Sequence, residues 1–541
     1  MSTVTLQQIL AALNDGDFYW SQSTITFSIP GPSASWAGYP SGDEQDSAGY
    51  STLSAGQAAY FRQAIAAWDA LIARTFVETS DAVAPGAIRV AFTDTEASSP
   101  GSVAYAYFPP YRGDAGPAWA GDVWLDDQTK SQAFNPGTDE YHTLLHELGH
   151  TLGLRHPFDG AGALPTEFEN MRYTVMSYDR PTDSVVRVFA LSGPTTLQMQ
   201  PTAIFPSTPM LLDVIAIQSK YGADPTTAAG ASVYTFDPTA AFFVTLYDAG
   251  GVDVIDLSNL TRGSRVDLRP EAFSSINYYS AADQIAYWQA QFPGYGSFIP
   301  DQINAATTYT WSDNLAIGPR TTIEQLRGGA GADTVLGNAA GNSIWGGGGD
   351  DRITAGSGRN FLRGDDGDDW IIGGADTDDS HGNMGNDTVQ GGAGDDWVVG
   401  GKDNDMLFGE DGSDVSLGNL GSDTIDGGAG DDVVRGGQGG DIVGGGTGAD
   451  WISGDRGDDT LTGGAGADIF HTFDGAGMDW VGDFSAAEGD RVFLLTGTAY
   501  TAYQQGADTI IDVSAGGTVT GRMVLVGVQF SALPNGWIFG G

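Results

Sequence analysis

A nine-residue repeat occupies a large part of the chain and restricts its fold more than any other feature. From Gly328 to His471 the sequence consists of sixteen consecutive nonapeptides of the form Gly-Gly-x-Gly-x-Asp-x-U-x, where U is apolar. The sixth position is Asp or Asn throughout, and the eighth is apolar except at Ser380 and Ser416. A flexible Gly/Asp linker would not keep this phase. The pattern predicts a right-handed parallel β-roll in which two nonapeptides form one coil.

The same repeat predicts calcium sites in the turns between coils. Glycines permit tight turns that expose backbone carbonyls, and the aspartates supply hard anionic oxygens, which calcium prefers. Residues 328–471 include 28 acidic and 6 basic residues, and these carboxylates would repel one another without cations. We therefore expect several structural Ca²⁺ ions and folding that depends on extracellular calcium. The predicted ligands are Asp333, Asp351, Asp369, Asp378, Asp387, Asp396, Asp405, Asp414, Asp423, Asp432, Asp441, Asp450, Asp459 and Asp468.

A second feature is the motif His146-Glu-Leu-Gly-His150-Thr-Leu-Gly-Leu-Arg-His156, which holds three of the six histidines. On a helix, His146 and His150 lie one turn apart on the same face and can share a metal ion. Gly153 can turn the chain so that His156 returns as a third ligand. Three neutral nitrogens are typical of one catalytic zinc with an open position for water. Glu147 is then the candidate general base.

The surrounding pattern indicates an α/β domain. A helix with an acidic first turn is expected from Thr138 or Asp139, and an amphipathic helix from Ser54. Short β-branched or aromatic runs at 88–92 and 121–125 predict strands between the helices. His142 lies one turn before His146, and we expect it to support the site rather than to bind metal.

About twenty residues beyond His156, the segment Tyr173-Thr-Val-Met176-Ser-Tyr178 completes a pattern that resembles the metzincins, and within them the serralysin-type secreted metalloproteases. The resemblance implies that Met176 forms a tight turn beneath the metal. It also implies that Tyr178 is an additional zinc ligand that leaves when substrate binds and then stabilises the oxyanion. The segment Ala120-Gly121-Asp122-Val123-Trp124-Leu125 is similar to the family's edge strand, along which an extended peptide substrate is bound.

We therefore predict a multidomain protein with an α/β metzincin protease domain followed by an all-β C-terminal domain. The protease domain is expected at 1–225, closed by a helix at 209–222. The remaining predicted regions are a β-rich segment at 226–327 with an insertion around 277–311, the β-roll at 328–471, and a C-terminal β segment with a secretion signal at 472–541. The insertion is a surface feature or an exosite for substrate.

Composition limits the partners. The chain has no cysteine, so disulfides and thiolate metal sites are excluded, and the net charge of −46 argues against nucleic acids and anionic membrane surfaces. Residues 1–20 have no basic segment and no long apolar core, so we do not expect them to act as a signal peptide, and no stretch has the length of a membrane span. The resemblance implies extracellular export by a type I secretion machinery that reads the C-terminus. We expect a monomer that cleaves protein or peptide substrates and that a proteinaceous inhibitor could bind.

The predicted function is that of a secreted zinc-dependent endopeptidase. An alternative from another class is a calcium-dependent adhesin or surface-layer protein with an inert protease-like domain, because such repeats accompany many activities. The joint presence of Glu147 and the three histidines favours the enzyme. A repeat-bearing lipase would need a serine in a Gly-x-Ser-x-Gly turn, which the sequence lacks.

Overall fold

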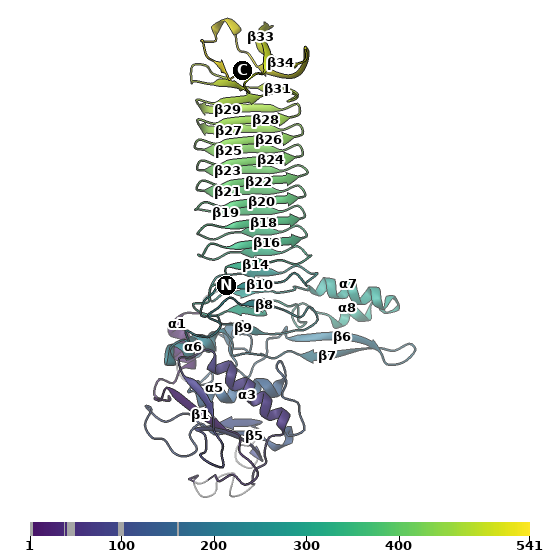
Figure 1. Cartoon of the computed structure of the whole chain (residues 1–541). Coiled ribbons are helices and arrows are strands. Elements are labelled where there is room, and N and C mark those ends of the chain that lie inside the picture. The colour runs from purple at the N-terminus through teal and green to yellow at the C-terminus, as the bar shows by residue number, and fades with distance from the viewer. Residues whose placement is uncertain (1–3, 37, 40–48, 96–101, 160–161, 541) are drawn as a thin grey trace. The chain divides into compact units, whose positions relative to one another are not determined.

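The computed structural model describes residues 4–36, 38–39, 49–95, 102–159 and 162–540 (Figure 1). The chain forms two compact units. Unit 1 comprises the residues up to Ala231 together with Thr239–Gly251 and Pro270–Thr321, and unit 2 comprises Ser232–Pro238, Val252–Arg269 and the residues from Thr322 onward. The chain therefore passes between the units several times, whereas the sequence analysis placed a single boundary near residue 225.

Unit 1 contains a five-stranded sheet in the order β2-β1-β3-β5-β4, in which only β4 is antiparallel to its neighbour. The strands are β1 (Thr24–Ser28), β2 (Thr75–Glu78), β3 (Ile88–Thr93), β4 (Ala104–Ala106) and β5 (Val123–Asp126). The main helices are α1 (Leu6–Leu13), α3 (Ala55–Asp69), α5 (Asp139–Thr151) and α6 (Leu211–Tyr221). The predicted α/β class of this domain is confirmed.

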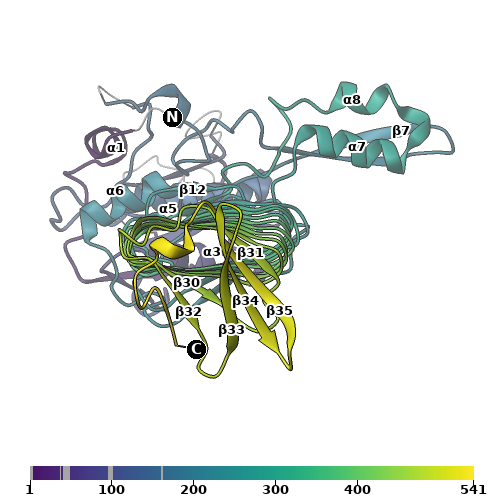
Figure 2. The same ribbon diagram turned by 90° about the horizontal axis from the view of Figure 1, so that it is seen from above.

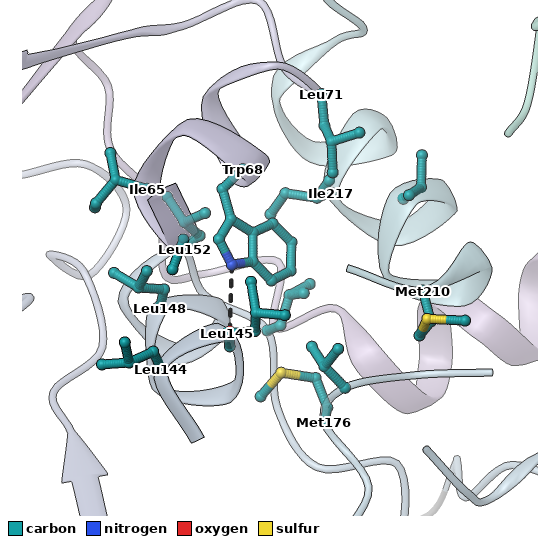
Figure 3. Packing of buried hydrophobic residues seen from close by; sticks show 14 of the residues in the cluster. Ile65, Trp68, Leu71, Leu144, Leu145, Leu148, Leu152, Met176, Met210 and Ile217 are labelled. Carbon is teal, nitrogen blue, oxygen red and sulfur yellow. Dashed lines mark hydrogen bonds between the residues drawn. The ribbon is translucent and has the colours of Figure 1, made fainter. Parts of the chain in front are cut away.

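The core of unit 1 joins α3 to α5 (Figure 3). Ser54 caps α3, and its hydroxyl accepts a hydrogen bond from Gln57 N at 3.3 Å. The indole Nε1 of Trp68 donates to Leu145 O at 3.2 Å. The apolar side chains buried around this contact include Phe61, Ile65, Leu144, Leu148 and Ile217. Most stability of such helices comes from packing of the apolar face, which here fixes α5 in place.

The prediction that 120–125 forms the edge strand is wrong. β5 pairs with β3 on one side and with β4 on the other, and all four of its residues are buried. The preceding Asp122 is also buried, and its carboxylate accepts a hydrogen bond from Arg89 Nη2 at 2.6 Å. The Val-Trp-Leu run of β5 buries more apolar surface than the Ala-Tyr-Ala of β4, so β5 takes the inner place. β4 is the terminal strand.

The 277–311 stretch folds as helices within unit 1. It contains α7 (Ala281–Gln291) and α8 (Phe298–Gln302), which lie along the hairpin of β6 (Val185–Leu191) and β7 (Leu197–Ala203) (Figure 2). Phe189, Leu197, Ile299 and Ile303 form a small core of their own between these elements. A third sheet of unit 1 contains β9 (Val244–Leu246), β12 (Phe273–Ser274) and β13 (Leu315–Ile317).

Unit 2 is a parallel β-solenoid of two 13-stranded sheets. One sheet contains β8 (Val233–Thr235), β10 (Val254–Asp256), β14 (Gln325–Arg327), β16 (Ser343–Gly348), β18 (Phe361–Asp366), β20 (Asp379–Met384), β22 (Trp397–Lys402), β24 (Val415–Leu420), β26 (Val433–Gln438), β28 (Trp451–Arg456), β30 (Ile469–Thr472), β32 (Arg491–Leu494) and β36 (Ile538–Phe539). The other contains β11 (Arg265–Asp267), β15 (Thr334–Leu336), β17 (Arg352–Thr354), β19 (Trp370–Gly374), β21 (Thr388–Ala393), β23 (Met406–Asp411), β25 (Thr424–Ala429), β27 (Ile442–Gly448), β29 (Thr460–Gly466), β31 (Met478–Val481), β35 (Thr518–Leu525), β34 (Asp508–Ala515) and β33 (Ala499–Gln505).

The register confirms two nonapeptides per coil. Within the repeat each residue pairs with the residue 18 positions later, as Thr334 does with Arg352 and Ser343 with Phe361. The apolar side chains at the eighth position point inward and are buried, among them Ile353, Leu407 and Val434. No helix in the described part of the chain is long and apolar enough to cross a membrane.

The glycine at the fourth position is required by both its conformation and its surroundings. Gly439 has a φ of 149°, and a Cβ atom there would lie 1.5 Å from Gly421 O of the neighbouring coil. Non-glycine residues at the second position, such as Asp365, Asn419 and Asp455, adopt φ between 68° and 76°. Asp and Asn tolerate this left-handed region better than most residues, which explains their presence there.

We predict that Gly439→Ala destabilises the roll, because the added methyl group forces neighbouring coils apart. The melting temperature of the full chain's β-sheet transition in millimolar calcium should fall by about 5 °C or more. Gln438→Ala in the same turn is the control, since its side chain is exposed. Equal melting temperatures for both variants would contradict this account.

Candidate active site and metal-binding residues

Helix α5 positions the first two histidines. It begins after Thr138, whose hydroxyl accepts a hydrogen bond from Tyr141 N at 3.3 Å, and Asp139 and Glu140 occupy its first turn. The predicted helix start is thus confirmed. His146 and His150 lie one turn apart with their ring centroids separated by 4.8 Å. Both are buried.

The three histidines of the motif converge on one point. The Nε2 atom of His156 lies 3.2 Å from His146 Nε2 and 3.0 Å from His150 Nε2. The ligand nitrogens of the three histidines all lie within 4.8 Å of one another, close enough to share one metal ion. Tyr178 is adjacent, with its hydroxyl oxygen 2.7 Å from His156 Nε2 and its ring stacked on His146. Partial desolvation of its hydroxyl, together with the nearby charges of Glu147 and Asp159, raises the pKa of Tyr178 to about 12.

The hydrogen bonds of the other ring nitrogens orient these histidines. Their Nδ1 atoms lie 2.8 Å from Val175 O for His146, 2.8 Å from Leu154 O for His150 and 2.9 Å from Asp159 Oδ2 for His156. All three partners are acceptors, so Nδ1 carries the proton and the lone pairs of Nε2 face inward. Burial lowers the pKa of each ring, to about 4 for His150. Three neutral imidazoles with this tautomer fit zinc.

Glu147 lies beside the convergence point. It is buried, and its Oε2 atom has no hydrogen-bond partner among the described residues. Burial raises the pKa of this carboxyl to about 8. A buried carboxylate oxygen without a partner is costly unless a ligand or water completes the site. The arrangement can hold or transfer a proton next to the three histidines.

Met176 lies directly beneath α5. It is fully buried, and a Cβ atom at Gly149 would lie 2.5 Å from its Sδ atom, so the helix needs glycine at that place. The turn around Met176 is held by Asp213 of α6, whose carboxylate accepts hydrogen bonds from Thr174 Oγ1 at 2.5 Å and Val175 N at 2.7 Å. Burial raises the pKa of Asp213 to about 7. Sequence reasoning missed this residue, although an acid within an apolar helix was a signal.

A cavity of about 470 Å³ opens beside these residues. Its lining residues are Ser102, Val103, Ala104, Asp139, His142, Thr143, His146, Glu147, Met171 and Tyr178. The edge strand β4 therefore lines the cavity, whereas Ala120, Gly121, Asp122, Val123 and Trp124 do not. His142 donates from Nε2 to Val175 O at 3.0 Å, and burial lowers its pKa to about 4. It supports the same carbonyl that orients His146.

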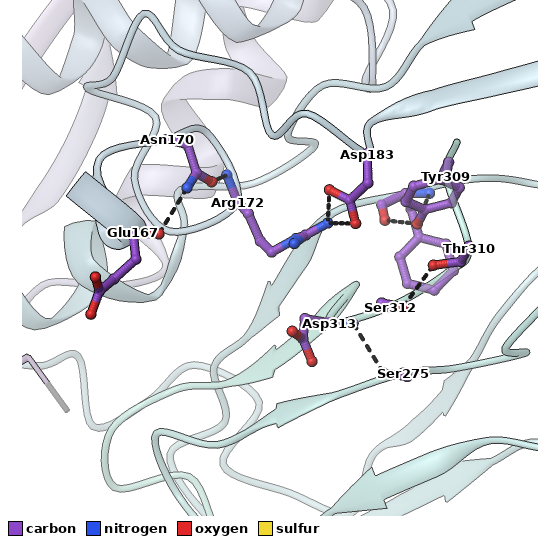
Figure 4. A network of polar contacts seen from close by, with 10 residues as sticks. Glu167, Asn170, Arg172, Asp183, Ser275, Tyr309, Thr310, Ser312 and Asp313 are labelled. Carbon is purple, nitrogen blue, oxygen red and sulfur yellow. Dashed lines mark hydrogen bonds and ion pairs between the residues drawn. The ribbon is translucent and has the colours of Figure 1, made fainter. Parts of the chain in front are cut away.

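A polar network braces the loop that leads to Met176 (Figure 4). The Nη2 atom of Arg172 donates to both carboxylate oxygens of Asp183 at 2.8 and 2.9 Å. Arg172 N donates to Asn170 Oδ1 at 3.1 Å, and Asn170 Nδ2 donates to Glu167 O at 3.0 Å. Because Met171 lines the cavity, these bonds hold one of its walls.

The repeat aspartates have a common geometry. In most coils, Oδ1 accepts a hydrogen bond from the backbone N–H of the aspartate 18 residues earlier, as Asp405 Oδ1 does from Asp387 N at 2.9 Å. Oδ2 is then buried without a partner among the described residues. This holds for Asp351, Asp369, Asp387, Asp396, Asp405, Asp414, Asp423, Asp432, Asp441, Asp450, Asp459 and Asp468. Unpaired, buried carboxylate oxygens fit a calcium ligand set.

Two predicted calcium ligands differ from the rest. Oδ2 of Asp333 accepts from Gly329 N at 3.0 Å, and Oδ2 of Asp378 accepts from Gly374 N at 2.5 Å. Asp333 lies in the first repeat, and the repeat of Asp378 has Asp376 where the pattern has glycine. The turns there are closed by protein hydrogen bonds instead.

Sequence reasoning missed two further aspartates beyond the repeat. Oδ1 of Asp490 accepts from Asp468 N at 3.1 Å, and Asp479 Oδ1 is buried without a partner in the described part of the chain. The pairings of Thr460 with Trp480 and of Ile469 with Arg491 show that these coils continue with 20 and 22 residues instead of 18. The signal was present: Asp479 and Asp490 are each followed two residues later by a buried valine.

Comparison with known families gives two matches. The model for matrixin matches residues 48–179, and the model for the RTX calcium-binding nonapeptide repeat matches six overlapping segments between residues 327 and 476. Together with the geometry above, these matches define a metzincin-type metalloprotease domain joined to RTX repeats. Metzincin domains use histidine-bound zinc, and RTX repeats bind calcium, so both metals agree with the residues described here.

Known proteins named serralysin or AprA are similar to part of this chain. The chain is 28% identical to a serralysin of Photorhabdus laumondii over 54% of its own length and 56% of the relative's. It is 28% identical to metallopeptidase AprA of Pseudomonas marginalis over 55% and 57% of the two chains, and 31% identical to serralysin C of Dickeya chrysanthemi over 35% and 40%. The matches thus span about half the length of these relatives. The two family matches and these relatives together support a serralysin-type metzincin protease.

The repeat geometry predicts an inverted pH dependence in the absence of calcium. Burial raises the pKa values of the repeat aspartates, to about 8 for Asp351 and Asp405 and about 7 for Asp369 and Asp387. In the unfolded chain these carboxyls ionise near pH 3.9. The folded, calcium-free roll therefore binds more protons than the unfolded chain, so its stability is greatest at acid pH and falls as the pH rises from about 4 to about 8.

Circular dichroism of the full chain in chelator should accordingly show more β structure and a higher melting temperature at pH 5 than at pH 8. Calcium should reverse the order, because ligand carboxylates must ionise, and its binding should release protons. Higher melting at pH 8 in chelator would contradict the burial of these groups.

Proposed function

We propose that the chain is a secreted zinc-dependent endopeptidase that hydrolyses peptide bonds in protein substrates. The convergence of three histidine Nε2 atoms beside the buried Glu147 carboxylate supports this function most directly. His146, His150 and His156 would hold the zinc, with Tyr178 as a fourth, displaceable ligand. Bound there, zinc supplies Lewis-acid chemistry that polarises a carbonyl and lowers the pKa of a water molecule.

The chain's own residues carry the proton transfers. Glu147 takes a proton from the attacking water and delivers it to the leaving amine. Its burial favours the protonated state between these two steps, while the charge of a bound metal favours the ionised state before them. Tyr178 has an exposed side chain and can turn away from His156 to donate a hydrogen bond to the developing oxyanion. Met176 and Val175 keep the histidines oriented.

The substrate is expected to bind as an extended strand along β4. This strand is the terminal one of its sheet, and Val103 and Ala104 line the cavity. Val103 O accepts from Asp126 N, and Tyr107 N donates to Asp122 O, so these groups face β5. By the alternation of an antiparallel ladder, Ala104 and Ala106 present their N–H and C=O groups to the open side. A peptide backbone can pair with them.

The roll supplies calcium-dependent folding for a protein that acts outside the cell. At cytosolic calcium the unpaired aspartates oppose folding, and extracellular calcium of about 10⁻⁴ to 10⁻³ M satisfies them. Export in the unfolded state by a type I secretion machinery agrees with this sequence of events. A proteinaceous inhibitor that occupies the cleft is a further expected partner.

Glu147→Ala should abolish hydrolysis of an unfolded protein substrate while zinc stays bound, because Glu147 acts as base and not as ligand. Loss of general acid–base catalysis alone lowers kcat by about 10²–10⁴. The assay uses the full chain in millimolar calcium, with Glu140→Ala on the same helix as the control. Retained activity in Glu147→Ala would remove this residue from the role of base, and an inactive parent with zinc and calcium bound would favour the adhesin alternative.

N-methylation of the substrate should locate the binding strand. In a model peptide with one cleaved bond, methylating an amide that pairs with Ala104 or Ala106 should lower kcat/KM about tenfold, the value of one lost hydrogen bond of about 1.4 kcal/mol. Methylation of alternate amides should have little effect, since those N–H groups face away from β4. Equal sensitivity at every position would argue against strand addition.

A further inference from the structure

The C-terminal end of α5 carries hydrogen bonds that the proposed chemistry does not use. The last carbonyl groups of an α-helix have no partner inside the helix. Here three successive carbonyls each accept a hydrogen bond from a side chain distant in sequence: Thr151 O from Trp20 Nε1 at 2.8 Å, Leu152 O from Tyr221 Oη at 3.0 Å and Gly153 O from Lys220 Nζ at 2.9 Å. We refer to Trp20, Lys220 and Tyr221 as the clamp.

The ammonium group of Lys220 donates all of its hydrogen bonds to backbone carbonyls. Besides Gly153 O, its ammonium donates to Asp15 O at 2.5 Å and to Phe18 O at 2.8 Å. An ammonium has three N–H donors, so all are used. Burial lowers its pKa to about 8. A cation at the C-terminus of a helix also interacts favourably with the helix dipole.

Tyr221 links Trp20 to the end of the helix. Its hydroxyl accepts a hydrogen bond from Trp20 N at 3.1 Å and donates to Leu152 O. The side chains of Tyr221 and Trp20 are both buried. Hydrogen bonds in such surroundings are costly to break, because the remaining partner is left unsatisfied.

The clamp holds the turn that brings in the third histidine. His146 and His150 belong to α5 itself, whereas His156 follows only after the chain leaves the helix at Gly153, which has a φ of 86°. A Cβ atom at Gly153 would lie 2.3 Å from Phe18 O and 2.6 Å from Lys220 Nζ. The chain that leads from Gly153 to His156 therefore starts in close contact with the clamp.

We infer that Lys220, Tyr221 and Trp20 are positioning residues for the metal ligand His156. They bind the carbonyls of residues 151–153 and so fix the turn that places His156 Nε2 beside the Nε2 atoms of His146 and His150. None of the three touches the cavity or the converging nitrogens. The inference rests on the zinc site of the proposed function.

The test is a double-mutant cycle on zinc affinity in the full chain with calcium. Lys220→Met and Tyr221→Phe are each made in the parent and in His156→Ala, and the dissociation constant for zinc is measured by competition with a chromogenic chelator. In the parent each substitution should weaken zinc binding about tenfold or more, as loss of outer partners of metal ligands does. In His156→Ala the same substitution should change affinity less than about twofold, because the ligand it positions is gone.

The visible absorption of the cobalt-substituted protein gives a second readout, because the d–d bands should shift towards those of His156→Ala in both clamp variants. Lys220→Arg should retain most of the affinity, and Lys130→Met, at an exposed lysine, is the control. If Lys220→Met does not fold, Tyr221→Phe decides alone. Unchanged affinity in the parent background, or equal loss in both backgrounds, overturns the inference. A parent chain that does not bind zinc overturns the proposed function as well.

Discussion

Buried polar atoms without protein partners are the constraint on which both parts of the molecule depend. In the roll, a carboxylate oxygen of most repeats is buried without a partner among the described residues. In unit 1 three Nε2 atoms converge on one point, and an oxygen of the neighbouring Glu147 is likewise buried without a described partner. Enclosing such atoms costs free energy that a cation or water must offset. A metal ion bound in either place would therefore lower the free energy for the same physical reason, in the roll by favouring folding and in the cleft by completing the proposed zinc site.

Several glycines are needed because a side chain in their place would clash with a neighbouring part of the chain. In the roll, Gly439 lies so close to the neighbouring coil that only hydrogen fits, and a Cβ atom at Gly436 would lie 2.3 Å from Asp441 Oδ2. In unit 1, Gly149 admits the sulfur of Met176 against the helix, and Gly153 admits Phe18 and Lys220. In each case the absence of a side chain lets another part of the chain pack closely beside residues of a predicted metal site.

Local sequence patterns predicted most of the site. The features that were not predicted depend on contacts between segments that are distant in the sequence. The helix spacing of His146 and His150 and the nine-residue period of the aspartates are local, so the sequence alone reveals them. The edge position of β4, the support from Asp213 and the helices within 277–311 depend on contacts between distant segments. Asp479 was missed because the coil length changes to 20 residues, which breaks the period while the pairing continues.

Helix α6 acts on the cleft at both of its ends. Asp213 in its first turn holds the turn of Met176, and Lys220 and Tyr221 in its last turn hold the C-terminus of α5. These positions are separated by about 10 to 12 Å along the helix, at about 1.5 Å per residue. One rigid element therefore sets both the floor beneath the histidines and the turn that brings in His156. The apolar face of α6 packs against Trp68 and Leu71, so the core fixes the position of this helix and, through it, the position of the three histidines.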